Sequence, residues 1–364
     1  MGTDKKILSV IVPSYNMEAY LPKCLGSLSA EPEFADKFEV LVVNDGSKDR
    51  TSAIAHEFET KQPGVFRVID KTNGNYGSCI NAALPAARGT YVKILDADDW
   101  FETANFSDYL RFLEMEAAKG EGAADFVLND FDFVYEDGRV FNTWRYDIPC
   151  GGAVPLGRFC TGYKWRTWMH AAAHKTANLL KTSYRQTEGV SYTDQEWIFY
   201  PFAAVRKMTY FPKVVYKYLI GREGQTCDPL IYLKSTPQQL GIVERMVKFY
   251  AENKNRLPEE NAKYLRNSVL YRLGMIYSAY LIRGAKFLSN EELAEFDLNV
   301  VRQDEEIYNA VADFVAFGRF KYPYVSVWRK RNCKPPLFLR LLRMAYLFRV
   351  NCLLRVRPQM RGGK

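Results

Sequence analysis

Residues Asp96-Ala97-Asp98-Asp99 place three carboxylates within four consecutive positions. Carboxylates this close repel one another unless a cation or a proton lies between them. Hard oxygen ligands at this spacing suit Mg²⁺ or Mn²⁺, and either ion could share them with a substrate diphosphate. The alternative is a solvated turn or a helix cap, because Asp-rich turns are common. The three carboxylates alone do not distinguish a cation site from a turn or cap, so the neighbouring segments must be considered.

The elements expected around these carboxylates alternate between strand and helix. Apolar runs predict strands at residues 7–12, 40–43, 66–69 and 91–95, and helical patterns occupy 18–28, 77–87 and the segment from about 49. Polar clusters directly follow three of the strands: 13–16, 44–47 and 96–99. The alternation predicts an α/β fold, a Rossmann-like and mostly parallel sheet with helices on both faces. Ligands of such sheets sit beyond the carboxyl ends of the strands, where these clusters fall.

The rest of the chain is mixed and then helical. Strand-like segments surround a helical stretch between 125 and 220, and from about 235 onward the apolar spacing is helical. Ser289–Glu292 has the pattern of a capping box. We expect an α/β domain over residues 1–227, a helical region over 228–334 and a basic tail over 335–364.

The charge is concentrated in that tail. The 364 residues carry a net charge of +8, yet 13 Lys and Arg and no Asp or Glu follow Asp313. Subtracting these 13 leaves −5 on the first 313 residues. On a helical wheel the tail has an arginine-free stripe, formed by Phe338, Leu341, Ala345, Phe348 and Cys352. The stripe could pack on the α/β domain, or the tail could lie on an anionic membrane surface.

Other classes of protein fit the sequence less well. The seven scattered cysteines include no CxxC pair, which favours reduced thiols over a disulfide framework or a zinc site. No run of about 18 apolar residues predicts a membrane-spanning helix. No nucleic-acid-binding motif is evident. We therefore expect a cytoplasmic protein that binds no nucleic acid, and that sits peripherally on the inner face of the membrane if the tail binds lipid.

Four segments together resemble the family 2 glycosyltransferases, which have the GT-A fold. The order and spacing of these segments agree with that family over residues 7–101, and the resemblance weakens beyond about 230. The matching segments are Ser9–Asn16, Val42–Asp49, Ala87–Tyr91 and Leu95–Trp100. The resemblance makes residues 1–227 a GT-A catalytic domain and implies a nucleotide-sugar donor.

The resemblance also implies roles for residues at the donor site. Pro13 and Tyr15 would line the nucleobase pocket, Glu18 would lie near the nucleotide, and Asp45 would accept a hydrogen bond from the base. Tyr15 could instead be a half-buried aromatic residue, and Glu18 a carboxylate favoured by a helix dipole.

The carboxylates gain roles from the same resemblance. Asp96 would address the ribose or hold the metal through water, and Asp98 would bind Mn²⁺ or Mg²⁺ directly. Asn75 belongs to an Asn/Gly-rich segment, 71–78, which leads into the helix before these carboxylates. This segment would either contact the donor or serve only as a structural loop.

The expected general base is Asp194, which lies where a helix starts, as acidic residues do in similar glycosyltransferases. A helix N-cap is its alternative role, and Glu196 is a weaker candidate base. Many relatives have Glu-Asp here, whereas this chain has Thr193-Asp194. Arg222, in a loop after the last strand of the domain, would contact the diphosphate or belong to a simple surface turn.

Further residues could line the acceptor side. His170 and His174 are spaced i, i+4, but Ala171 rules out an HExxH zinc motif, so we predict ordinary helix histidines or one acceptor contact. The aromatic residues Tyr163, Trp165 and Trp168 could stack on a sugar, and core packing is their alternative role.

The sequence thus predicts a metal-dependent inverting glycosyltransferase. It would transfer a sugar, from a UDP-sugar in our expectation, to a hydroxyl of a glycan or lipid-linked acceptor in bacterial surface polysaccharide synthesis. The alternatives are a nucleotidyltransferase and a non-catalytic partner subunit. A nucleotidyltransferase would carry a Gly-rich, basic signature after the first strand, where this chain has Pro13–Asn16.

Overall fold

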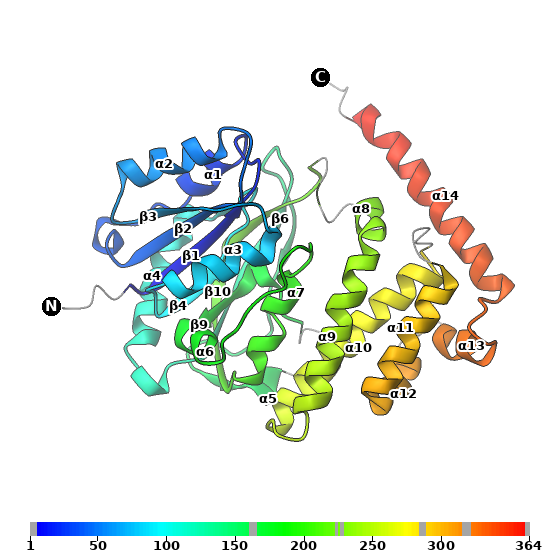
Figure 1. Ribbon diagram of the computed structural model, residues 1–364. Coiled ribbons are helices and arrows are strands. Elements are labelled where there is room, and N and C mark those ends of the chain that lie inside the picture. Colours follow the sequence, from blue (N-terminus) through cyan, green and yellow to red (C-terminus); the bar gives the residue numbers. More distant parts are fainter. Residues whose placement is uncertain are drawn as a thin grey trace. The chain divides into compact units, whose positions relative to one another are not determined.

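The computed structural model describes residues 6–159, 166–222, 225, 229–283, 289–314 and 322–360. The chain forms two compact units, Met1–Glu223 and Gly224–Lys364. In Figure 1 the first runs from blue to green and the second from green-yellow to red.

The first unit is built on one mixed sheet. Its strands follow the order β3-β2-β1-β4-β9-β6-β10-β5, with β7 paired to β6 and β8 paired to β10. Continuous apolar runs form β1 and β2 because both of their faces are buried. The strand bounds are β1 (Leu8–Ser14), β2 (Phe38–Asn44), β3 (Phe66–Asp70), β4 (Tyr91–Ile94), β5 (Trp100–Phe101), β6 (Phe126–Val134), β7 (Val140–Trp144), β8 (Val154–Pro155), β9 (Ala172–Lys175) and β10 (Lys207–Leu219). The predicted α/β class and the four predicted strands are confirmed.

The pairing directions bring the candidate residues to one edge. Strands β3, β2, β1 and β4 are mutually parallel, and β6 runs parallel to β10. Strand β9 is antiparallel to both β4 and β6. The residues just before β9 therefore lie at the same edge as the carboxyl ends of β4 and β6. The loop before β9 can therefore lie beside the loops that follow β4 and β6.

Helices cover both faces of the sheet, with α1 and α2 on one face and α3 on the other (Figure 1). The helices are α1 (Leu21–Gly26), α2 (Thr51–Lys61), α3 (Asn75–Ala83), α4 (Thr103–Ala117), α5 (Leu156–Phe159), α6 (Thr176–Lys181) and α7 (Asp194–Trp197). Helix α1 begins at Leu21, later than the predicted residue 18. Before it, the backbone N–H groups of Asn16, Met17 and Glu18 donate hydrogen bonds to the side chains of Ser47, Thr51 and Asp49.

The prediction that His170 and His174 are helical was wrong. His174 lies on β9, and His170 lies in a single 3₁₀ turn (Met169–Ala171) before that strand. Strand pairing with β4 and β6 overrides the local i, i+4 spacing there. Burial lowers the pKa of both imidazoles to about 3, so both are neutral.

A buried polar network explains the Arg88-Gly89 segment of the sequence. Glu39 accepts hydrogen bonds from the Ser9 hydroxyl (2.6 Å), the Arg88 backbone (2.6 Å) and the Arg88 Nε (2.8 Å). The backbone N–H of Gly89 donates to Ser9 Oγ, and a Cβ on Gly89 would lie only 2.3 Å from the Ser9 nitrogen. The network therefore fixes the start of β4, and with it the carboxylates at the end of that strand.

The second unit is helical. Its helices are α8 (Pro229–Lys234), α9 (Thr236–Asn253), α10 (Glu259–Leu281), α11 (Asn290–Gln303), α12 (Glu305–Phe314), α13 (Tyr324–Lys330) and α14 (Leu337–Met360). The capping box of Ser289 and Glu292 is present as predicted. Asp297 is buried and binds Arg329 at 2.7 Å, which joins α11 to α13. Among the described helices, none combines the length and the apolar character needed to cross a membrane.

Candidate functional site

Two of the three carboxylates after β4, Asp96 and Asp99, are held by tyrosines from distant elements. Tyr216 on β10 donates to Asp99 Oδ2 at 2.6 Å and accepts the backbone N–H of Asp96 at 3.1 Å. The other oxygen of Asp99 accepts the Leu219 N–H at 2.7 Å. Tyr76 on α3 donates to Asp96 Oδ1 at 2.8 Å. Strand β10 and helix α3 therefore position the carboxylates together.

Burial and mutual repulsion favour protonation of these carboxyl groups when no cation is bound. Burial, and then the charge of Asp98, raise the pKa of Asp96 to about 7. Burial and the same neighbour raise the pKa of Asp99 well above its usual value. A bound cation would relieve both effects. The oxygen-rich donor set thus fits a hard divalent ion such as Mg²⁺ or Mn²⁺.

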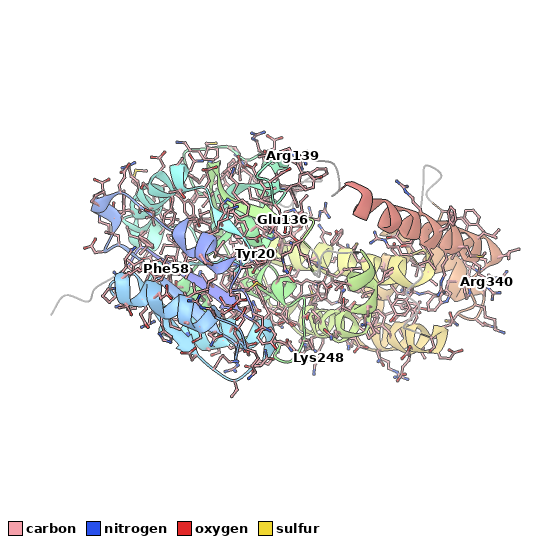
Figure 2. All side chains as sticks on the ribbon, turned by 90° about the horizontal axis from the view of Figure 1, so that it is seen from above. Tyr20, Phe58, Glu136, Arg139, Lys248 and Arg340 are labelled. Carbon is pink, nitrogen blue, oxygen red and sulfur yellow. The ribbon has the colours of Figure 1, made fainter. Side chains whose placement is uncertain are left out.

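Asp98 and Arg222 form an ion pair. The guanidinium lies 2.8 Å (Nη2) and 3.1 Å (Nε) from Asp98 Oδ2, and both side chains are more than 80% buried. Arg222 also lies over the ring of Tyr20, 5.3 Å from its centroid. The hydroxyl of Tyr20 donates to Glu136 at 3.3 Å, and the two residues are neighbours in Figure 2. The expected metal ligand and the expected diphosphate ligand are therefore in direct contact.

Asp45 follows β2 and is almost completely buried. Its Oδ1 accepts hydrogen bonds from Lys71 Nζ (2.7 Å) and the Gly74 N–H (2.9 Å). Lys71 and Gly74 belong to the segment that leads into α3, whose first residue, Asn75, is exposed and has a positive φ of 65°. Asp45 thus anchors the loop that opens α3.

The remaining donor-site candidates lie after β1. Pro13 is buried within the strand, and the Tyr15 side chain is 46% exposed. Glu18 accepts the backbone N–H of Arg50 at 2.9 Å, directly before α2. This contact is the helix-end role that the sequence left open for Glu18, although the helix is α2 and not α1. The structure brings Pro13, Tyr15 and Asp45 to the same edge of the sheet, because β1 and β2 are in parallel register.

Asp194 is the first residue of α7. Burial is the main cause of the raised pKa of Asp96 and of Tyr76, and the charge of Asp194 adds a smaller contribution to both. Glu196 is buried, and its carboxylate accepts hydrogen bonds from the Thr187 backbone (2.7 Å) and hydroxyl (2.8 Å). Glu196 thus holds the loop before α7, a positioning role rather than that of a base.

That loop is fixed against α3. Asn81 donates to the Gln186 carbonyl (2.9 Å) and to Glu188 (2.8 Å), and the Gly189 N–H donates to the Gly74 carbonyl (2.9 Å). A Cβ on Gly77 would lie 2.1 Å from the Thr187 oxygen, so only glycine allows this approach.

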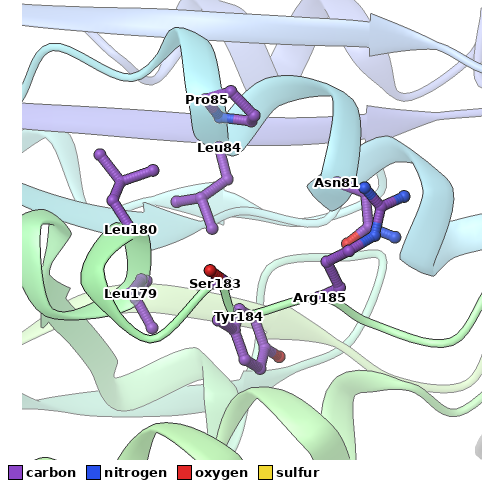
Figure 3. Close-up of a pocket in the computed structure, with 8 residues that line it drawn as sticks. All are labelled: Asn81, Leu84, Pro85, Leu179, Leu180, Ser183, Tyr184 and Arg185. Atoms are coloured by element: carbon purple, nitrogen blue, oxygen red, sulfur yellow. The ribbon is translucent and has the colours of Figure 1, made fainter.

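A cavity of about 190 Å³ lies where α3 meets α6 and the start of this loop (Figure 3). Its lining residues are Asn81, Leu84, Pro85, Leu179, Leu180, Ser183, Tyr184 and Arg185. None of the residues predicted from the sequence lines it. Pockets for small molecules usually measure about 300–1,000 Å³. We interpret the cavity as a gap in the joint between α3 and the loop.

Sequence reasoning missed three residues that complete the site: Tyr76, Lys93 and Tyr216. Lys93 is fully buried on β4, and its Nζ donates to the carbonyl of His170 at 2.7 Å and to Asn129 at 2.9 Å. A ring nitrogen of His170 lies within 4.8 Å of carboxylate oxygens of Asp96 and Asp99. No local motif identifies these residues, because strand register alone brings them together. Tyr163 and Trp165 lie outside the described residues.

The first part of the chain is similar to known proteins. Residues 9–145 match the family model described as glycosyl transferase family 2. An uncharacterized glycosyltransferase of Mycoplasma pneumoniae, the MG025 homolog, is 41% identical over 99 residues, which are 27% of this chain and 33% of that protein. The Bacillus subtilis protein EpsJ, also an uncharacterized glycosyltransferase, is 38% identical over 100 residues, 28% of each chain.

One relative has solved structures. The Staphylococcus aureus poly(ribitol-phosphate) beta-N-acetylglucosaminyltransferase TarS is 34% identical over 106 residues, 29% of this chain and 18% of TarS. The sequence matches thus span about a third or less of these curated relatives. The structure of TarS 1–349 in complex with UDP superposes with a TM-score of 0.63 at 19% identity, covering 93% of this chain and 90% of that one. The first unit therefore has the GT-A fold, and within it residues 9–145 match glycosyl transferase family 2.

Proposed function

We propose that the chain is an inverting, divalent-cation-dependent glycosyltransferase. It transfers a sugar from a UDP-sugar to a hydroxyl of a glycan or lipid-linked acceptor in bacterial surface polysaccharide synthesis. The observation that carries the proposal is the placement of Asp96 and Asp98 directly after β4, at the carboxyl edge of the parallel strands of a segment that matches family 2, together with Asp194 at the start of α7. Paired carboxylates for a cation and a separate carboxylate for a proton are the groups that such a transfer needs.

The donor side is formed by the loops after β1, β2 and β4. The exposed ring of Tyr15 offers a stacking face for the nucleobase, and Pro13 and Asp45 complete the pocket at the neighbouring strand ends. Asn75 and Glu18 border it, at the start of α3 and beside the start of α2. TarS, whose structures contain UDP or UDP-GlcNAc, supports a uridine nucleotide as the donor.

Asp98 and Asp96 would hold Mg²⁺ or Mn²⁺, which would neutralise charge on the departing nucleoside diphosphate. Arg222 forms an ion pair with Asp98, and it would contact the diphosphate with its planar guanidinium. Tyr76 and Tyr216 hold Asp96 in place through its side chain and its backbone. Their hydrogen bonds fix the carboxylate without help from the substrate.

Asp194 would accept the proton of the acceptor hydroxyl as that oxygen attacks the sugar. Helix α7 starts at this residue, and Glu196 and Asn81 fix the preceding loop on α3. The base is therefore held at a set place relative to Asp96 before the acceptor binds.

The exposed apolar side chains of the basic tail support the proposal that the protein binds the membrane peripherally. The side chains of Phe338, Leu341 and Phe348 on α14 are exposed, at 50%, 55% and 73%. Cys352, the last residue of the predicted stripe, has a side chain outside the described part of the chain. An exposed apolar stripe flanked by arginines suits an anionic lipid surface, which would keep the enzyme at the cytoplasmic face near a lipid-linked acceptor.

The test is a donor screen. Purified protein is incubated with individual nucleotide sugars and Mn²⁺ or Mg²⁺, and release of the nucleoside diphosphate is measured with and without EDTA. We expect release from a UDP-sugar that EDTA abolishes and that Asp98→Asn lowers by at least about 100-fold, because several kcal/mol of charge stabilisation is lost. Release that continues in EDTA would contradict the metal role.

Asp194→Asn tests the base separately. Removing a general base costs about 10²- to 10⁴-fold in transfer, while UDP binding should stay within twofold of the wild type. The matched control is Asp108→Asn, a surface carboxylate on α4 that pairs with Arg111 and Lys213. Normal transfer by Asp194→Asn would refute the assignment.

A further inference from the structure

An aromatic face lies at the carboxyl ends of β6 and β10, beside the carboxylates. Strand register places Phe131 of β6 opposite Trp144 of β7 on one side and Tyr216 of β10 on the other, and it places Phe133 opposite Tyr218. Trp168 and His170, just before β9, pack on these rings. The aromatic cluster, as we name it, consists of Phe131, Phe133, Trp144, Trp168, His170, Tyr216 and Tyr218. The centroids of its contacting rings lie 4.2–6.4 Å apart, from His170–Tyr218 to Phe131–Trp144.

The two faces of these strands differ sharply in charge. Residues between the cluster members along each strand point the other way, and there Lys217 binds Asp132 and Glu102, both at 2.8 Å. Thr143 donates to Asp132 on the same side. The cluster itself contains no charged side chain, since burial keeps His170 neutral with a pKa of about 3.

The cluster touches the proposed reaction centre. Its member Tyr216 hydrogen-bonds both Asp96 and Asp99, and a ring nitrogen of His170 lies within 4.8 Å of carboxylate oxygens of the same two residues. The Nζ of Lys93 donates a hydrogen bond to the backbone carbonyl of His170 and fixes it there. A molecule bound on the cluster would therefore lie next to the donor site.

Three polar atoms of the cluster are buried without a hydrogen-bond partner: Nε1 of Trp144, Nε1 of Trp168 and Nδ1 of His170. Each such group costs about 1–3 kcal/mol when left unpaired. Phe133, Trp144, Trp168 and Tyr218 are partly exposed, whereas Phe131, His170 and Tyr216 are buried. Partly exposed rings and unpaired nitrogens together are features of a site whose partner arrives with a ligand.

We propose that the aromatic cluster is the acceptor subsite and that it binds a neutral pyranose ring. The inference rests on the proposed function and specifies its acceptor. A sugar ring presents C–H groups to an aromatic face and hydroxyls to indole N–H groups, which matches rings and unpaired donors in one cluster. A polyol-phosphate chain would need cations, and the members of the cluster supply none.

The test uses full-length protein labelled with ¹⁵N-tryptophan, in the presence of UDP and Mg²⁺. Its six tryptophans give six indole N–H signals, assigned by single Trp→Phe variants. Two pyranosides, methyl β-D-glucopyranoside and methyl β-D-N-acetylglucosaminide, are titrated to 100 mM. Ribitol 5-phosphate, an open-chain polyol phosphate without a sugar ring, is titrated for comparison. We expect the pyranosides to shift the signals of Trp144 and Trp168 downfield. The Trp328 signal should stay, because its N–H already donates to Asn290.

Variants test the same site by affinity. Trp168→Phe keeps a ring but removes the N–H, and should weaken pyranoside binding about fivefold, while Trp168→Ala should abolish it. The matched control is Phe141→Leu, on the opposite face of β7 and 63% exposed, which should bind as the wild type does. UDP affinity, measured by calorimetry, should be unchanged in all three and reports that each variant is folded.

The subsite is overturned if the pyranosides leave the Trp144 and Trp168 signals unmoved, or if ribitol 5-phosphate shifts them as strongly. Both results come from the wild-type protein and do not depend on the folding of a variant. Failure of the proposed function would appear differently, as absence of UDP binding and of nucleoside diphosphate release.

Discussion

At the scale of single residues, the contact between Asp98 and Arg222 links the two charges that the donor must meet. The cation would bind Asp98 and the diphosphate would bind Arg222, so the ion pair at 2.8 Å has to open for both. Cation and nucleotide binding would therefore be coupled. Each compensates the charge that the other separates from its partner.

Arg222→Gln tests this coupling. Without nucleotide, Asp98 loses its competing partner, so affinity for Mn²⁺ should rise about tenfold, while affinity for UDP should fall. Calorimetric titrations with Mn²⁺ alone and with UDP measure the two effects. Arg139→Gln, an exposed arginine paired with Asp137, is the control and should change neither. Unchanged affinity for Mn²⁺ in Arg222→Gln would show that the pair does not compete with the cation.

The sequence located most acidic residues of the site but not the side chains that hold them. Asp96 and Asp98 directly follow a predicted strand, and the parallel topology already implied that they lie near Asp45. Tyr216 is 120 residues from Asp96, and only the register of β10 brings it there. Such contacts depend on long-range pairing, which local patterns do not encode. The roles assigned to the site residues stay predictions for the experiments above.

At the scale of elements, the same limit explains the histidines. The apolar runs of β1 to β4 are continuous and buried, so their prediction needed only local sequence. Strand β9 is short and alanine-rich, and its conformation depends on pairing with β4 and β6. The i, i+4 spacing of His170 and His174 therefore gave a wrong helix.

The joint between α2 and β3 gives a prediction for pH. His56 on α2 contacts Asp70 and Glu59, both at 2.8 Å, and these hydrogen bonds, Asp70 first, raise the pKa of the imidazole. The protonated imidazole stabilises the folded state. This stabilisation is complete below the pKa of histidine in the unfolded chain, about 6.5, and it is lost as the pH rises through the higher pKa of the folded state. His56→Ala should therefore be destabilised at pH 5.5 and hardly at all at pH 8.5. The loss at pH 5.5 should be only about 0.5 kcal/mol, because the side chains of His56 and Asp70 are each 47% exposed.

Urea unfolding of wild type and His56→Ala at both pH values measures that difference. His170 and His174 are neutral in the folded state and take up protons on unfolding at pH 5.5, but the wild type and the variant both contain them, so their effect cancels in the difference. Glu57→Gln, on the exposed side of α2, should show no such dependence on pH. If the loss of unfolding free energy in His56→Ala were larger at pH 8.5 than at pH 5.5, this mechanism would be contradicted.

At the scale of the whole molecule, the net charge of +8 conceals two opposite parts, an acidic body and a tail after Asp313 with 13 basic residues. Helix α14 is attached within its unit through Leu339, which is fully buried, and through Phe338 against Tyr322. Leu341, Met344 and Phe348 extend from there with more than half of each side chain exposed. The helix thus has an anchored start and an uncovered apolar side.

Deleting residues 335–364 should therefore abolish binding to anionic vesicles while leaving nucleoside diphosphate release intact. Each basic residue near an anionic surface contributes about 1 kcal/mol, and the apolar stripe adds burial in the interface. Sedimentation with phosphatidylglycerol vesicles should remove the full-length protein at 50 mM salt and less of it at 500 mM, since salt screens the attraction. Phosphatidylcholine vesicles are the control for charge, and Phe348→Ser, which keeps every arginine, isolates the apolar part. Equal sedimentation of full-length and shortened protein would mean that α14 serves another purpose than holding the enzyme at a membrane.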